Sequence, residues 1–416
     1  MNSKFAPLFK AYFLLFSVVL FFSCRKSSTP VLNNPVGSNG VFYIQCINPA
    51  GANVLKKIDT HDTNANWEVL DYSSGQSFSY DSGHIYGGSY SSLSSYDAST
   101  GIYDWNFYWL NVYNGNYIQP AFKDSLVFCT KASDFWDFSY LFCVNRNTGG
   151  MKWRNQLDSA GAIRSSSFQS NPIVVNNDVI ATTRSYNNDL RIVCFDILRG
   201  QKIWASAINN TLSSMIKIDD GKIYSTTGRY ASCYSTVDGS LLWQTDTRSS
   251  YNSTLTFFDQ TKIVVSKDSG NTNTIIILDK SSGSIINSFT PNIPGEYYRG
   301  TAYANNTLYL SSFFDSAYEL RAYNINDMTQ KWKYTFAPCG WFSSLASIIT
   351  DKYLIVSVDL PTVYNPAISI PDDSSQAKML FLDFSGKLVT QVPYVGYYTR
   401  GFVYLDNGVP YKIEGY

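Results

Sequence analysis

Short runs of β-branched and aromatic residues, separated by polar turns, recur along the chain after residue 40. In one unit, apolar runs at 171–175, 179–183 and 190–195 are followed by the turn 196–200 and a further run that begins at Lys202. Each run has the length of a β-strand, and a glycine closes the turn, where a positive φ is needed. No stretch past residue 40 shows the sustained 3.6-residue period of a helix. The pattern predicts an all-β protein.

This unit repeats along the chain. In five copies, a polar turn residue lies eight positions before a tryptophan: Asp97 and Trp105, Asn145 and Trp153, Asp196 and Trp204, Ser235 and Trp243, Asn324 and Trp332. A glycine lies four positions before four of these tryptophans, and Met328 replaces it in the fifth. Two further copies, around Gly283 and Gly386, lack the tryptophan, and we place a degenerate first copy at 47–56.

Eight copies of about four short strands predict an eight-bladed β-propeller of four-stranded antiparallel blades over residues 41–416. The end of the chain, 401–416, has the pattern of the first two strands of a blade, and its beginning, 41–57, has the pattern of the last two. We therefore expect the N- and C-terminal strands to share one blade, which removes an open sheet edge. The five repeat tryptophans are expected to pack on the next blade.

Residues 1–24 have the pattern of a lipoprotein signal peptide. Lys4 and Lys10 precede the apolar stretch Ala11–Phe22, which is shorter than the roughly 20 residues that cross a bilayer. It ends before Ser23-Cys24, which resembles a lipobox, so Cys24 is the predicted lipidation site. Residues 25–40 are rich in Pro, Ser, Asn and Gly and predict a flexible tether. Because no Asp follows the cysteine, we expect the outer membrane, with the protein facing the periplasm.

The aligned tryptophan motif resembles the tryptophan-docking repeat of propellers of the pyrroloquinoline quinone (PQQ) type, and the resemblance covers residues 41–416. Anchor, blade count and motif are similar to those of the propeller lipoproteins of the outer-membrane β-barrel assembly machinery. The quinoprotein dehydrogenases of this fold carry a vicinal Cys-Cys disulfide, and some carry a Cys-x-x-Cys-His haem motif. Neither occurs in this sequence, so the resemblance implies the fold and not the activity.

The composition of the chain argues against several classes of function. The chain has 32 Lys+Arg, 32 Asp+Glu and 2 His, and this balance argues against a nucleic-acid-binding protein. Two histidines leave few candidates for His-based catalysis or metal binding. The run Asp62-x-Asn64-x-Asn66 begins like a calcium loop but lacks the glycine and the final glutamate, so we interpret it as a solvated turn. We predict no cofactor and no metal.

Four cysteines fall two positions before a turn residue or its presumed equivalent: Cys46, Cys143, Cys194 and Cys233. Equivalent positions in neighbouring blades are too far apart for disulfides, so we expect small buried hydrophobic residues there. Cys129 and Cys143 flank one hairpin, and a disulfide between them stays open.

Aromatic residues outside the repeat suggest a binding face. Trp109, Trp136 and Trp341 fall in long links that should emerge on one face of the propeller, while Trp67 also lies outside the repeat column. Two matching links, 295–303 and 396–404, are expected to place further aromatic and basic residues near the mouth of the channel: Tyr297, Tyr298, Arg299, Tyr397, Tyr398 and Arg400. Such residues are typical of binding surfaces; the alternative is that they pack over the blade ends.

Three functions follow as hypotheses. The first is a monomeric, non-enzymatic, membrane-anchored scaffold that binds envelope proteins through this aromatic face. The second is a glycan-binding module, because exposed Trp and Tyr rings stack on sugars. The third is a quinoprotein dehydrogenase that uses PQQ.

Overall fold

A computed structural model describes most of the chain after residue 39. The described residues are 40–48, 50–71, 77–88, 92–109, 119–131, 140–156, 167–168, 170–184, 190–208, 214–227, 229–248, 253–257, 260–268, 273–291, 297–314, 317–336, 347–358 and 377–412. The chain divides into residues 1–35 and 36–416, and the fold below is that of the second unit. Within the described residues, no helix is long and apolar enough to cross a membrane.

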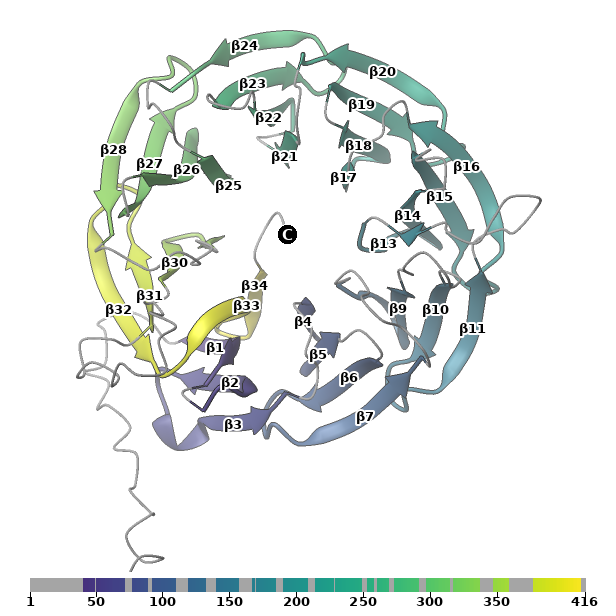
Figure 1. The fold of residues 1–416 in the computed structure, drawn as a ribbon, viewed down its shortest axis with the longest axis vertical. Coiled ribbons are helices and arrows are strands. Elements are labelled where there is room, and N and C mark those ends of the chain that lie inside the picture. The colour runs from purple at the N-terminus through teal and green to yellow at the C-terminus, as the bar shows by residue number, and fades with distance from the viewer. Residues whose placement is uncertain are drawn as a thin grey trace, which may run out of the picture. The chain divides into compact units, whose positions relative to one another are not determined.

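The fold is an eight-bladed β-propeller with antiparallel blades, as predicted (Figure 1). The only helix among the described residues is the single 3-10 turn η1, Thr63–Ala65. In a typical blade, four strands follow one another from the channel outwards, each paired with the next. This order brings the fourth strands of all blades to the outside of the ring.

The strands of blades 2 to 4 are β4 (Ser77–Asp81), β5 (His84–Gly88), β6 (Ser92–Asp97) and β7 (Tyr103–Tyr108); β8 (Ala121–Lys123), β9 (Leu126–Lys131), β10 (Tyr140–Asn145) and β11 (Met151–Gln156); and β12 (Ser167–Phe168), β13 (Ile173–Val175), β14 (Asp178–Arg184), β15 (Leu190–Asp196) and β16 (Lys202–Ile208). In blade 4, β12 and β13 both pair with β14, so the inner strand is divided in two around Pro172. A proline cannot donate to a ladder, which explains the break.

The strands of blades 5 to 8 are β17 (Ser214–Asp219), β18 (Lys222–Thr227), β19 (Tyr230–Ser235) and β20 (Leu241–Asp246); β21 (Ser253–Phe257), β22 (Lys262–Asp268), β23 (Asn273–Asp279) and β24 (Ile285–Phe289); β25 (Tyr297–Ala304), β26 (Thr307–Phe314), β27 (Ala317–Asn324) and β28 (Gln330–Thr335); and β29 (Ser347–Ile349), β30 (Leu354–Val358), β31 (Ala377–Leu382) and β32 (Leu388–Tyr394).

Blade 1 is shared between the two ends of the chain, as predicted, but the division differs from the prediction. Its order is β3 (Trp67–Leu70), β2 (Asn53–Asp59), β1 (Gly40–Ile47), β33 (Tyr397–Asp406) and β34 (Val409–Lys412). The N-terminal segment therefore supplies three strands rather than two. The C-terminal segment supplies the inner strand β33 and a fifth strand, β34, on its channel side (Figure 1).

The first repeat copy was consequently misplaced. Residues 47–56 form the hairpin between β1 and β2, whereas the turn equivalent to the other copies begins at Asp59. Trp67 lies eight residues after Asp59 and pairs with Lys57, just as the repeat tryptophans pair with the residue two before their turn. Trp67 therefore belongs to the repeat. Cys46, in β1, does not share the third-strand position of Cys143, Cys194 and Cys233.

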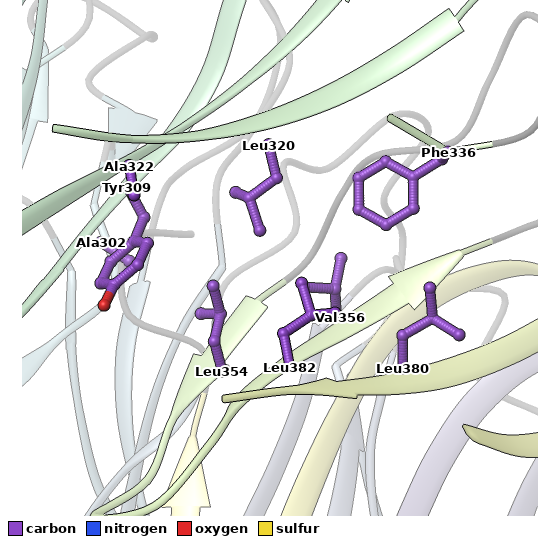
Figure 2. Packing of buried hydrophobic residues seen from close by; sticks show 9 residues of the cluster. All are labelled: Ala302, Tyr309, Leu320, Ala322, Phe336, Leu354, Val356, Leu380 and Leu382. Carbon is purple, nitrogen blue, oxygen red and sulfur yellow. The ribbon is translucent and has the colours of Figure 1, made fainter. Parts of the chain in front are cut away.

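The core lies between the blades rather than within them. Figure 2 shows one such cluster, in which Tyr309, Leu320 and Ala322 of blade 7 point towards Leu354, Val356 and Leu382 of blade 8. Each blade presents one apolar face to each neighbour because successive strand residues point to opposite faces. Burial between the blades therefore determines the stability of the ring.

Six tryptophans dock on the next blade, as expected for five of them. In each case the indole ring covers a turn glycine with positive φ, and a Cβ on Gly149, for example, would lie 2.6 Å from Cε3 of Trp105. The pairs are Trp67 and Gly101, Trp105 and Gly149, Trp153 and Gly200, Trp204 and Gly239, Trp243 and Gly283, and Trp332 and Gly386. No side chain other than hydrogen fits under the ring, which explains the glycine column.

Hydrogen bonds supplement this packing. Five of the six indole Nε1–H groups donate to a backbone carbonyl in the next blade, such as Trp153 to Ile197 O at 3.0 Å. The residue two after the tryptophan adds a second bond in three blades, for example from Thr245 Oγ1 to Gly283 O at 2.6 Å. The Trp204 indole is the exception, since Nε1 is buried and finds no acceptor among the described residues.

Candidate functional site

The two matching segments predicted at the channel mouth lie at the start of inner strands rather than in links. Tyr297, Tyr298 and Arg299 begin β25, and Tyr397, Tyr398 and Arg400 begin or follow in β33. The structure describes the backbone of these residues and not their side chains. β25 is the inner strand of blade 7. In blade 1, β34 pairs with residues 403–406 of β33 on the channel side, and blade 8 lies between these two blades (Figure 1).

Both segments carry a register shift that includes the arginine. In β25 the register shifts between Tyr298 and Thr301, so that Arg299 lies in the bulge. In β33, Tyr397 pairs with Ile47 and Gly401 pairs with Gln45, which leaves the residues from Tyr398 to Arg400 opposite Cys46 alone. Bulges redirect side chains and are over-represented beside functional sites. The arginines of the two similar sequences therefore both lie in irregular backbone, with two residues opposite one in β25 and three opposite one in β33.

A buried lysine of blade 1 holds the segment that precedes β33. Lys56 Nζ, with 10% of its side chain exposed, contacts Glu68 Oε2 at 2.9 Å and donates to the carbonyl of Val395, two residues before β33. On the opposite face of the blade, Gln45 Nε2 donates to Asp71 Oδ2 at 2.6 Å, and both residues are buried. Buried polar groups that are paired in this way specify one geometry. Sequence inspection missed this cluster, although Lys56 and Glu68 are cross-strand partners.

A second ion cluster lies in blade 7. Glu319, which is 9% exposed, accepts from Lys333 Nζ at 2.8 Å and from Arg321, and these two cations hold the pKa of its carboxyl below its usual range even though burial opposes them. Glu319 pairs with Ser312, which in turn pairs with Tyr298 at the start of β25. The start of β25 therefore lies two strands from this ion cluster, whereas Lys56 directly contacts the residue two positions before β33.

Of the three predicted link tryptophans, only Trp109 lies within the described residues. Trp109 is 9% exposed and stacks on Phe142 of the next blade, with ring centroids 5.8 Å apart and an interplanar angle of 11°. It packs in the core between blades 2 and 3, so the packing alternative describes Trp109. Trp136 and Trp341 lie outside the described residues, as does Cys24.

The remaining sequence candidates take structural roles. Asp62 accepts from the backbone N–H of Asn64, and Asn66 Oδ1 accepts from Asp59 N–H at 2.6 Å, so these oxygens serve the turn itself. Cys129 and Cys143 are free thiols on opposite faces of blade 3, and burial raises the pKa of Cys143 to about 12. Within the described residues, no three His, Cys, Asp or Glu side chains gather as a metal site would require.

Comparison with known proteins places this architecture in a family. The family model described as "Outer membrane protein assembly factor BamB" matches residues 89–207 and 188–335, which together make up more than half of the chain. The chain belongs to this family. It has the PQQ-like propeller fold that the repeat predicted. A search of curated protein sequences finds no match.

Solved structures share the fold at low sequence identity. BamB from Moraxella catarrhalis superposes with a TM-score of 0.54 at 12% identity, covering 75% of this chain and 92% of that one. A europium-containing methanol dehydrogenase gives 0.57 at 10% identity, with 77% and 81% covered. The dihydro-heme d1 dehydrogenase NirN gives 0.63 at 10% identity, with 89% and 75% covered. Enzymes and assembly factors both use this fold, so it does not by itself decide the activity.

Proposed function

We propose that this propeller is a non-enzymatic scaffold that binds other envelope proteins at the channel mouth formed by the starts of β25 and β33. The register shifts that include Arg299 and Arg400 are the observation on which the proposal rests. Two blades carry a Tyr-Tyr pair followed by an arginine, directly in β25 and after Thr399 in β33. Aromatic and arginine residues carried by a folded framework are typical of protein-binding sites. The family's assembly-factor description supports this proposal.

The proposal includes a lipid anchor at Cys24, in the outer membrane and facing the periplasm. The sequence before Asn39 supports it through the apolar stretch, the lipobox-like end and the polar tether. Mass spectrometry of the mature N-terminal peptide tests it directly. A diacylated Cys24 is expected, and an unmodified peptide that begins elsewhere would contradict the anchor.

The binding site is tested by crosslinking in native membranes, read by mass spectrometry. The double variant Arg299→Glu and Arg400→Glu should lose a defined set of crosslinked envelope proteins. Arg199→Glu, an exposed arginine on the turn 196–200 of blade 4, is the matched control and should retain that set. Equal capture of these envelope proteins by the wild-type chain, the double variant and Arg199→Glu would contradict the proposed site.

The same variants separate the other two hypotheses. Binding on a glycan array that Arg299→Glu abolishes would assign the site to carbohydrate. Because Trp109 is buried, it supplies no sugar platform in that case. Formation of a complex with PQQ and calcium, followed by absorption spectroscopy and substrate-dependent reduction, would instead establish a dehydrogenase and overturn the scaffold.

A further inference from the structure

The outer strands of the eight blades differ in how their open edges are protected. An outer strand presents unpaired N–H and C=O groups, and natural proteins usually block such edges with charges, proline or a twist. Seven of the eight outer strands carry at least one charged residue or a proline: Glu68 in β3, Asp104 in β7, Lys152 and Arg154 in β11, Lys202 in β16, Asp246 in β20, Lys331 and Lys333 in β28, and Pro393 in β32.

β24, with the sequence Ile285-Ile286-Asn287-Ser288-Phe289, has neither. It is the last strand of its sheet, and its first four side chains are exposed; Ile285 and Ile286 are 51% and 50% exposed. Asn287 takes the position at which six other outer strands carry a docked tryptophan. β24 therefore carries no charged residue or proline on its own edge and has no tryptophan that docks on the next blade.

Charge disfavours pairing with a second copy of this chain at two of the other outer edges. When an edge strand pairs with its own copy about a two-fold axis, the two strands run antiparallel and each residue meets a residue of the same strand. Centred on Trp332, β28 would set Lys331 against Lys333 of the other copy, and like charges directly opposite are unfavourable. β11 would likewise set Lys152 against Arg154.

β24 is self-complementary. With the two-fold axis at Asn287, all five residues pair: Ile285 meets Phe289, Ile286 meets Ser288, and Asn287 meets itself. No charge is brought to another, and an apolar pair forms at each end. We propose that two copies of this chain associate edge to edge through β24, so that two four-stranded blades form one eight-stranded sheet. The dimer would replace the monomer expected from sequence.

The mass of the full-length chain in solution, measured by sedimentation over a wide concentration range, tests this dimer. We expect a reversible monomer–dimer equilibrium that Ser288→Lys weakens at least tenfold, since the new charge lies on the edge. Gln391→Lys on β32, at an exposed outer-strand position, is the matched control and should leave the equilibrium unchanged. Circular dichroism confirms that both variants are folded.

A cysteine at the two-fold axis gives a second readout. Asn287→Cys should form an intermolecular disulfide under mild oxidation, whereas Gln330→Cys on β28 should not. The wild-type chain, which keeps its own cysteines, gives the background. A chain that stays monomeric at every concentration, or a dimer that Ser288→Lys leaves intact, would overturn the proposal. Neither readout involves β25 or β33, so its failure leaves the proposed scaffold function untouched.

Discussion

The interface between blades 4 and 5 and the interface between blades 6 and 7 solve the same packing problem in opposite ways. Between blades 4 and 5, Trp204 covers Gly239, and the residue opposite Trp204 on the third strand is the small Cys194. Between blades 6 and 7, the outer position is Asn287, and the residue opposite it is the large Ile277. Between blades 6 and 7 the large side chain therefore lies on the third strand, β23, rather than on the outer strand, β24.

The receiving turn changes together with the tryptophan. Blade 7 has Met328 at φ 60° where blades 2 to 6 and blade 8 have glycine, and its side chain packs against the cluster that contains Tyr323 and Phe289. The interface between blades 8 and 1 follows the same rule. There Thr390 takes the tryptophan position and Phe381 lies opposite it, in contact with Phe42 and Tyr404.

The residues that repeat together therefore belong to the interface between two neighbouring blades and not to a single blade. A tryptophan, a small residue opposite it and a glycine in the next blade occur together at five interfaces, with Ser95, Cys143, Cys194, Cys233 and Ala322 as the small residues. The first interface departs only in Lys57. Close packing explains why the three positions change together.

Trp204→Ala is the largest expected effect. It removes the indole ring that covers Gly239 and should lower the free energy of unfolding by about 3–5 kcal/mol. Asn287→Ala, at the equivalent exposed position of blade 6, should change stability by less than about 0.5 kcal/mol. Urea denaturation followed by tryptophan fluorescence and circular dichroism measures both, and similar losses would contradict the comparison.

Gly149→Ala is expected to lower the free energy of unfolding by about 3 kcal/mol, because the new Cβ would overlap the Trp105 ring and the φ of Gly149 is +66°. Gly221→Ala is the matched control. Its φ is +65°, but the nearest atom to a Cβ is Thr236 Oγ1 at 3.8 Å, so it should cost only the roughly 1 kcal/mol of left-handed strain. Thermal denaturation compares them, and equal losses would show that the tryptophan contact is unimportant.

Transplanting the docked interface into blades 6 and 7 tests whether the three positions act together. Asn287→Trp alone should lower the free energy of unfolding by about 1–3 kcal/mol, since Ile277 and Met328 occupy the space that the new indole ring needs. Adding Ile277→Cys and Met328→Gly should recover at least about 1 kcal/mol through coupling between neighbours. Additive losses in the triple variant would refute the rule.

Much of this fold could be predicted from sequence because one large residue recurs at a fixed offset. Trp67 was not recognised as a repeat tryptophan because η1 replaces the usual glycine turn, although the spacing from Asp59 to Trp67 is kept. The division of blade 1 was wrong for the same reason, since the misplaced first copy assigned β1 to the third strand.

The candidate site was harder to predict. The matched Tyr and Arg segments were found, but periodicity cannot reveal a bulge, which depends on a register shift between distant strands such as β1 and β33. The burial of Trp109 depends on Phe142, 33 positions further along the chain, which no local pattern links to it. Contacts between residues far apart in the sequence therefore decided both outcomes.

The smallest effect concerns the turn that receives the tryptophan. Asp279 Oδ1 accepts from the Ser281 hydroxyl at 2.6 Å and from Ser282 N–H at 2.8 Å, and these bonds, led by the Ser281 hydroxyl, lower the pKa of Asp279 to about 2. In blade 3, Asn145 makes the same kind of turn without a charge, accepting from Asn147 and Thr148 N–H.

Because the folded-state pKa of Asp279 lies below the usual aspartate value of about 3.9, the unfolded chain binds more protons between these values. Its stabilisation is complete above about pH 4 and is lost as the pH falls through about 2. Asp279→Asn should therefore reduce the drop in urea midpoint between pH 5 and pH 2.5, and Asn145→Asp should increase it. The two variants should change the drop in urea midpoint in opposite directions, because the two turns differ chiefly in whether the accepting side chain can bind a proton. A change in the same direction in both variants would mean that the hydrogen bonds do not shift the pKa of the aspartate.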